Sequence, residues 1–179
     1  MFRTENKKYG VSLLLVFMMI MFALTGCGSG SGEALDISKV TYVKSPGNQQ
    51  NIEMYVISSD CTVKHYDIKQ TSDKKIVIKD LFEGKLPSAE EYTVDSSKVS
   101  PEGWQQLENK LNETEFIYLS GDVSYTDQLM DEGSFFVEIQ TGMIKHLAGG
   151  YNAGRGKDKD NKKFRSVTDI LDNILADAG

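Results

Sequence analysis

The fold class of this chain is decided by the stretch Ser134-Phe-Phe-Val-Glu-Ile-Gln140, Thr141-Gly142, Met143-Ile-Lys-His-Leu-Ala148. Phe135, Val137 and Ile139 recur at every second position, which is the period of a half-buried strand. A second apolar run follows directly after the Thr-Gly pair. Two such runs joined by a short glycine-containing turn predict a β-hairpin, and therefore an antiparallel sheet.

Further strands are expected upstream of this hairpin. Ile52–Ser58 alternates, and a polar turn leads from it into Thr62–Lys69, which predicts another hairpin. β-branched and aromatic residues predict strands over Ile37–Val43, Lys75–Lys79 and Phe116–Leu119. The second of these holds the continuous apolar run of residues 76–78, which indicates a buried strand. Residues 83–99 lack a clear period, so we expect a loop with room for one short strand.

Two helices are predicted. Ser100 and Pro101 form a helix start, and apolar residues recur at helical spacing as far as Asn112 (Trp104, Leu107 and Leu111). Lys163–Ala176 carries a second apolar stripe (Phe164, Val167, Leu171, Ile174 and Leu175). Strands grouped around a mid-chain and a C-terminal helix predict an α+β fold. We expect residues 35–179 to form a single domain, with an antiparallel sheet of hairpins packed on both helices and one wet face.

The N-terminus indicates export from the cytoplasm. Arg3, Lys7 and Lys8 precede an apolar run over Val11–Leu24, which is shorter than the roughly 20 residues of a membrane-spanning helix. Small residues and a cysteine follow this run. The sequence therefore predicts a signal peptide over residues 1–26. An uncleaved N-terminal anchor with a chance cysteine at its end is the alternative.

The ending Leu24-Thr25-Gly26-Cys27 resembles the lipobox of bacterial lipoproteins. The resemblance implies that Cys27 carries a diacylglycerol thioether after cleavage, and that the protein is held on the extracytoplasmic face of the cell membrane. Residues 27–34 are rich in glycine and serine, so they would be a flexible tether. The mature domain is similar to small uncharacterised lipoproteins of Gram-positive bacteria, and it resembles no characterised family.

Charge and cysteine content restrict the partners. Without residues 1–26 the chain keeps 17 of its 20 basic and 25 of its 26 acidic residues, a formal net charge of −8. Such a charge argues against nucleic acid as a partner and against a second, electrostatic attachment to anionic lipid. Cys61 would be the one thiol left, so the domain has no disulfide framework. We expect a monomer, stabilised by its core and attached to the membrane by its acyl chains.

No residue pattern indicates catalysis or a metal. His65 and His146 each lie in a strand-like run without a second histidine at ligand spacing, and we expect both on the solvent face of the sheet. Residues 158–161 lack the glycine and glutamate of a calcium loop, and the acidic segment 122–132 fits a solvated loop. The sequence contains no nucleophile elbow, phosphate loop or dinucleotide motif. We therefore assign no catalytic residue, no metal ligand and no cofactor.

The stretch Gly149-Gly-Tyr-Asn-Ala-Gly-Arg-Gly156 is the candidate binding loop. Tyr151, Asn152 and Arg155 are side chains typical of recognition surfaces, and loops held by rigid elements often carry binding residues. The alternative is a simple connection in which Tyr151 packs on the sheet. A phosphate cradle is disfavoured, because Lys157–Lys163 would separate the glycines from the helix.

These observations leave two functions open. The favoured one is a non-enzymatic module of the cell envelope that binds a protein or a glycan through a sheet face or the loop. The alternative is a hydrolase acting on the envelope with a carboxylate pair that the sequence does not reveal. A deep pocket with converging acids or with His146 would favour the enzyme, and a continuous sheet with shallow grooves would favour binding.

Overall fold

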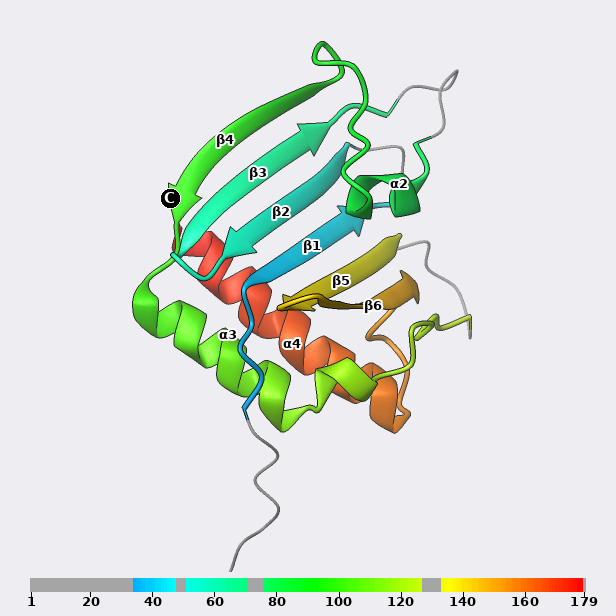
Figure 1. The fold of residues 1–179 in the computed structure, drawn as a ribbon. Helices are drawn as coiled ribbons and strands as arrows, with labels where there is room; N and C mark the ends of the chain where they lie inside the picture. Colours follow the sequence, from blue (N-terminus) through cyan, green and yellow to red (C-terminus); the bar gives the residue numbers. More distant parts are fainter. Residues whose placement is uncertain (1–33, 48–50, 71–75, 127–132, 179) are drawn as a thin grey trace, which may run out of the picture. The chain divides into compact units, whose positions relative to one another are not determined.

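The fold is built on one six-stranded sheet in the order β4-β3-β2-β1-β5-β6 (Figure 1). The computed structural model describes residues 34–47, 51–70, 76–126 and 133–178, and Leu35–Gly179 forms one compact unit. All neighbouring strands are antiparallel, as predicted. The strands are β1 (Lys39–Ser45), β2 (Ile52–Ser58), β3 (Thr62–Ile68), β4 (Tyr92–Lys98), β5 (Ser134–Thr141) and β6 (Ile144–Tyr151).

Both predicted hairpins are confirmed. β2 and β3 pair across a tight turn, and β5 and β6 pair across Gly142 and Met143. β6 continues to Tyr151, so the first part of the predicted glycine-rich loop is strand. The edge of β6 is partly covered by the segment after α3, because Asp122 forms a parallel bridge with Gly149.

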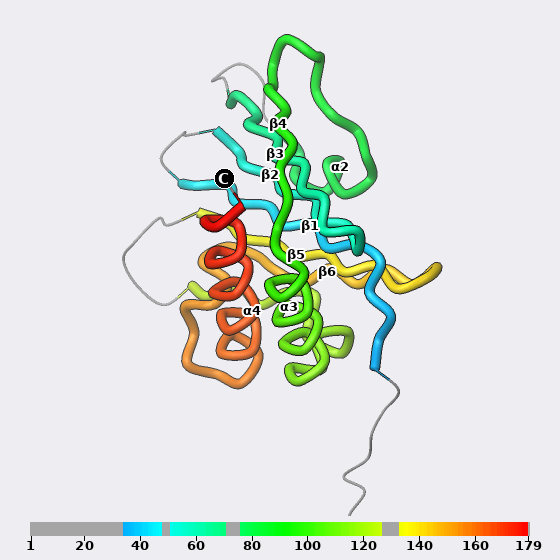
Figure 2. The backbone as a smooth tube through the Cα atoms, turned by 90° about the vertical axis from the view of Figure 1, so that its left-hand side faces the viewer, coloured from blue at the N-terminus to red at the C-terminus, as the bar shows by residue number. Residues whose placement is uncertain are grey.

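The two predicted helices lie side by side on one face of the sheet (Figure 2). In α3 (Pro101–Glu113), the Ser100 side chain accepts a hydrogen bond from the Gly103 amide at 3.0 Å, and the predicted apolar stripe is buried. α4 (Lys159–Ala176) begins four residues before the predicted start at Lys163. The reason is Asp158, whose carboxylate accepts a 2.8 Å hydrogen bond from the Asn161 amide and caps the helix there.

Two predicted strands are wrong. The apolar run at 76–78 leads into a short helix, α2 (Ile78–Phe82), and Val77 is 56 % exposed. α2 packs Leu81 and Phe82 on the sheet face opposite to α3 and α4, so that face, which we expected to be wet, is partly covered. Phe116–Tyr118 is a 3₁₀ turn, η1, entered through Glu115 at φ 52°. Phe116 is fully buried because the turn inserts it into the main core rather than pairing it with a strand.

Candidate functional site

On the sheet face that carries α3 and α4, the side chains change along the strands from buried and apolar at one end to charged at the other. The pairing of neighbouring strands places side chains of this face in successive rows. The first row is apolar and at most 1 % exposed: Val63, Ile57, Val40 and Ile139. The second row is His65, Tyr55, Tyr42 and Val137, and the third is Asp67, Glu53, Lys44 and Phe135. We call the third row, with His65 and Tyr55 behind it, the open end.

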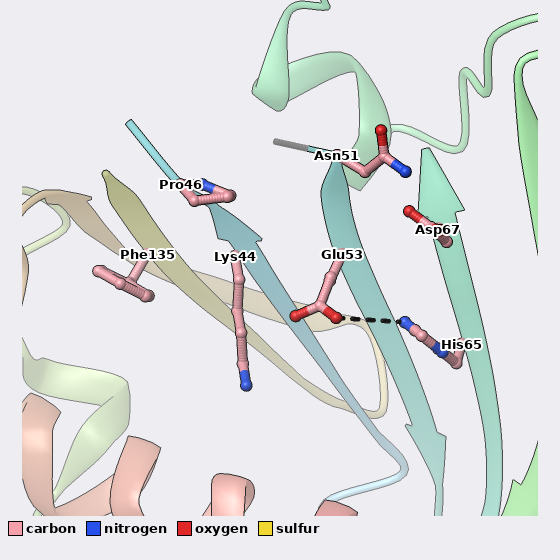
Figure 3. Close-up of a pocket in the computed structure, with 7 residues that line it drawn as sticks. All are labelled: Lys44, Pro46, Asn51, Glu53, His65, Asp67 and Phe135. Atoms are coloured by element: carbon pink, nitrogen blue, oxygen red, sulfur yellow. Dashed lines mark ion pairs between the residues drawn. The ribbon is translucent and has the colours of Figure 1, made fainter. Parts of the chain in front are cut away.

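The open end borders a groove of about 570 Å³ (Figure 3). Side chains of the third row line it together with Pro46, Asn51 and His65. Glu53 and Asp67 lie directly opposite each other on β2 and β3, so both carboxylates belong to the same groove. Like charges in this cross-strand position repel each other, which favours a ligand that brings hydrogen-bond donors between them.

An aromatic pair forms the inner wall of the open end. The rings of Tyr55 and His65 stack with centroids 4.4 Å apart and planes 3° apart. His65 Nε2 is buried without a hydrogen-bond partner, and it lies 3.9 Å from Glu53 Oε1. Burial, and then the neighbouring carboxylate of Glu53, raises the pKa of Tyr55 to about 12. Tyr55 therefore stays a neutral hydrogen-bond donor at the pH of any cell.

Lys44 connects the open end to α4. Its Nζ lies 2.6 Å from Asp172 Oδ1, and it also lies 5.1 Å above the ring of Tyr42 and 5.5 Å above that of Tyr55. Burial and then the charge of Asp172 raise the pKa of Tyr42, so this phenol also remains protonated. Asp172 thus balances the charge of Lys44, whereas Glu53 interacts with Tyr55 and His65, and both Glu53 and Asp67 line the groove.

The three residues proposed from the glycine-rich loop are separated by the structure. Arg155 is exposed and lines a cavity of about 110 Å³ that shares Phe135 with the larger groove, so it borders the open end. Tyr151 is 40 % exposed, but it pairs with Ser134 and its side chain alternates onto the other face of the sheet. Asn152 is 8 % exposed and has a left-handed backbone conformation. Its backbone amide donates a hydrogen bond to the Gly133 carbonyl at 2.8 Å.

Asn161 organises this loop, a role that no pattern in the sequence indicates. Its Oδ1 accepts hydrogen bonds from the amides of Gly154 and Gly156, and its Nδ2 donates to Asp158. A Cβ atom on Gly156 would lie 2.6 Å from side-chain atoms of both Asp158 and Asn161, so a larger residue would displace the hydrogen bond between these two side chains. The argument that Lys157–Lys163 separates the glycines from the helix is wrong, because the helix starts at Lys159. Asp158 itself occupies the helix N-terminus, where a phosphate would have to bind.

The remaining candidate residues lie elsewhere. His146 is not on a solvent face: its ring packs edge-on against Phe116, 5.9 Å away, on the side of α3 and α4. Cys61 is half-buried in the turn between β2 and β3 at φ 65°. Within the described ranges, no group of three or more His, Cys, Asp or Glu side chains could hold a metal ion. Asp122 caps the Ser124 amide, and Asp127, Asp131 and Glu132 lie outside the described residues, as does Cys27.

No known protein family matches this chain, and no curated protein matches it. In the part of the chain that the structure covers, no helix combines the length and the apolar character that crossing a membrane requires.

Proposed function

We propose that the protein is a lipid-anchored module on the extracytoplasmic face of the cell membrane that binds a glycan of the bacterial envelope at the open end. The observation that carries this proposal is the row of Asp67, Glu53, Lys44 and Phe135, which borders a groove of about 570 Å³. The anchor itself is supported by the lipobox resemblance at Leu24–Cys27.

The chemistry of the groove fits a saccharide. Glu53 and Asp67 accept hydrogen bonds, and sugar hydroxyls and amides are suitable donors. Phe135 offers a half-buried ring at the other end of the row, against which the apolar face of a sugar can pack. Because Lys44 is paired with Asp172, it keeps the row ordered without attracting anions strongly.

Binding of N-acetylglucosamine oligomers and of muropeptides, followed by amide NMR shifts, tests this proposal. The double variant Glu53→Gln/Asp67→Asn should weaken binding at least tenfold, since hydrogen bonds to charged groups contribute about 1.5–3 kcal/mol each. Glu90→Gln/Glu102→Gln is the matched control, because both side chains are exposed and it changes the net charge equally. Absence of saccharide binding, or equal weakening in both double variants, would contradict the proposal.

Hydrolysis of the same glycan is the second candidate, and one observation favours it. Glu53 and Asp67 are cross-strand neighbours that line one groove, and glycosidases use a pair of carboxyl groups. His146, the other sign of an enzyme that we considered, lies outside this groove. Mass spectrometry of the saccharide after incubation separates the two functions: an unchanged ligand supports binding, and a cleaved one supports hydrolysis.

A further inference from the structure

The sheet end opposite to the open end collects lysines on the face that carries α2. In the outermost row, Lys39 of β1 pairs with Gln140 of β5, and Gln140 pairs with Lys145 of β6. At the other side of the sheet, Lys98 of β4 pairs with Thr62 of β3. In the next row on this face, Lys64 of β3 pairs with Val56 of β2, and Val56 packs against the apolar cluster that contains Leu81 and Phe82 of α2. We call this surface the basic end; its lysines are Lys39, Lys64, Lys98 and Lys145.

The carboxylates near the basic end offset only part of these charges. Glu138 is 7 % exposed and forms an ion pair with Lys145 at 3.8 Å, so it offsets part of the charge of that lysine. Glu83 is paired with Lys85 at 2.7 Å. Asp60 is exposed in the β2–β3 turn, where its carboxylate accepts a hydrogen bond from the Thr62 amide. This hydrogen bond, and then the charge of Lys98, lower the pKa of the Asp60 carboxyl, so Asp60 offsets part of the charge of Lys98. Lys39 and Lys64 therefore supply most of the positive charge that remains at this end, although the mature chain is acidic.

An apolar turn projects beside the lysines. Met143 is fully exposed and Ile144 is 59 % exposed. Met143 lies in the β5–β6 turn and Ile144 is the first residue of β6, and this tip of the hairpin stands out from the sheet in Figure 2 (yellow). Exposed aliphatic side chains beside lysines are the composition of a surface that enters the boundary between lipid headgroups and acyl chains.

The chain enters the domain beside the same end. The amide of Ser38 donates to the Gln140 carbonyl at 2.9 Å, and the amide of Leu35 donates to Asn112 Oδ1 at 3.0 Å. Residues 27–34 would be the whole connection to an acylated Cys27, and a chain of that length reaches at most about 28 Å even when fully extended. Such a short tether keeps the domain close to the bilayer, so weak contacts are enough to dock it.

We propose that the basic end, together with Met143 and Ile144, docks on the anionic headgroups of the membrane that holds the anchor. This inference rests on the proposed lipid anchor. Because β1 runs from Lys39 at the basic end to Lys44 at the open end, docking turns the open end away from the bilayer toward the envelope. The net charge of −8 argued against an electrostatic attachment, but that argument ignored where the charges lie.

Tryptophan fluorescence in vesicles tests the docking. The full, acylated chain is reconstituted into phosphatidylcholine vesicles with or without phosphatidylglycerol, and brominated acyl chains serve as quenchers. Met143→Trp should be quenched in the anionic vesicles and less at high salt. Tyr151→Trp, at the opposite end of β6, is the matched control and should not be quenched. The parent chain supplies the background signal of Trp104, which is 7 % exposed.

Charge variants of the Met143→Trp chain decide whether the lysines act locally. Lys64→Gln/Lys98→Gln should lower the ratio of docked to undocked molecules at least tenfold, since each lysine near an anionic surface changes this ratio about fivefold. Lys157→Gln/Lys162→Gln makes the same net-charge change near the start of α4 and should have little effect. The docking proposal is contradicted if both pairs of substitutions have equal effects, or if Met143→Trp is not quenched in vesicles that carry the protein. Neither outcome contradicts the lipid anchor. Failure of the parent chain to float with either kind of vesicle would overturn the anchor itself.

Discussion

The side-chain oxygen of Asn161 accepts a 2.8 Å hydrogen bond from the backbone amide of Gly154, and this contact joins α4 to the end of β6. The same oxygen accepts from the Gly156 amide at 3.1 Å. Asn161 is 4 % exposed, so water cannot replace these bonds. The glycine-rich loop is therefore held by α4 on both sides of Arg155, at the border of the open end.

Asn161→Ala should lower the free energy of unfolding by about 2–4 kcal/mol, because it leaves buried amides without partners. Chemical denaturation measures this loss. Asn173→Ala is the control on the same helix, since Asn173 is exposed, and it should stay within about 0.5 kcal/mol of the parent. A similar small change for Asn161→Ala would mean that the loop does not depend on this side chain.

Trp104 anchors α3 in the main core, where it is 7 % exposed. Trp104→Ala should cost about 3–5 kcal/mol through lost contacts and the cavity left behind. Residues 35–179 expressed without lipid should unfold cooperatively as a monomer, and reducing agent should not change the transition. Gln105→Ala, an exposed neighbour on α3, serves as the control. A loss below about 1 kcal/mol for Trp104→Ala would contradict the role of this ring in the core.

The sequence predicted the elements whose signals are local. The alternation in Ile52–Ser58 and the cap at Ser100 act within a few residues, and the structure confirms both. The run at 76–78 misled because a short apolar segment does not reveal whether it pairs as a strand or packs as a helix. The latter occurs here, since α2 covers apolar residues of β1, β2 and β3.

The open end could not be predicted, because it depends on register. Asp67, Glu53 and Lys44 belong to three strands, and nothing in any one strand indicates that the others lie beside it. The loop residues were easier to notice because they are close in sequence. Of those, only Arg155 borders the groove, since β6 extends to Tyr151 and alternation turns that side chain to the other face.

His146 should make stability sensitive to mild acid. Burial lowers its pKa, against the smaller opposite effect of the Leu119 backbone, while the unfolded chain has the ordinary value near 6.5. Between the two pKa values the unfolded state binds more protons, so stability falls as the pH falls through that range. The melting temperature of the parent should therefore drop more between about pH 7.5 and 5.5 than that of His146→Phe. If the melting temperatures of the parent and of His146→Phe fall equally over this pH range, His146 does not take up a proton on unfolding.

Cys27 should be the acylated N-terminal residue of the mature protein. The motif Leu24-Thr25-Gly26-Cys27 supplies each position of a lipobox after a short apolar run. Mass spectrometry of the native N-terminus measures the modification, and Cys27→Ser should release or mislocalise the protein. An unmodified Cys27, or an intact Met1 in mature protein, would contradict this prediction.

The candidate loop makes the last prediction. Tyr151→Ala with Arg155→Ala should weaken ligand capture at least tenfold and leave stability within about 1 kcal/mol, because both side chains are exposed. The single variants then separate the two residues. Arg155→Ala should account for most of the loss, since Arg155 shares the border at Phe135 with the open end, whereas Tyr151 faces the other side of the sheet. If the double variant unfolds, or captures the ligand as well as the parent does, the loop is only a connection between β6 and α4.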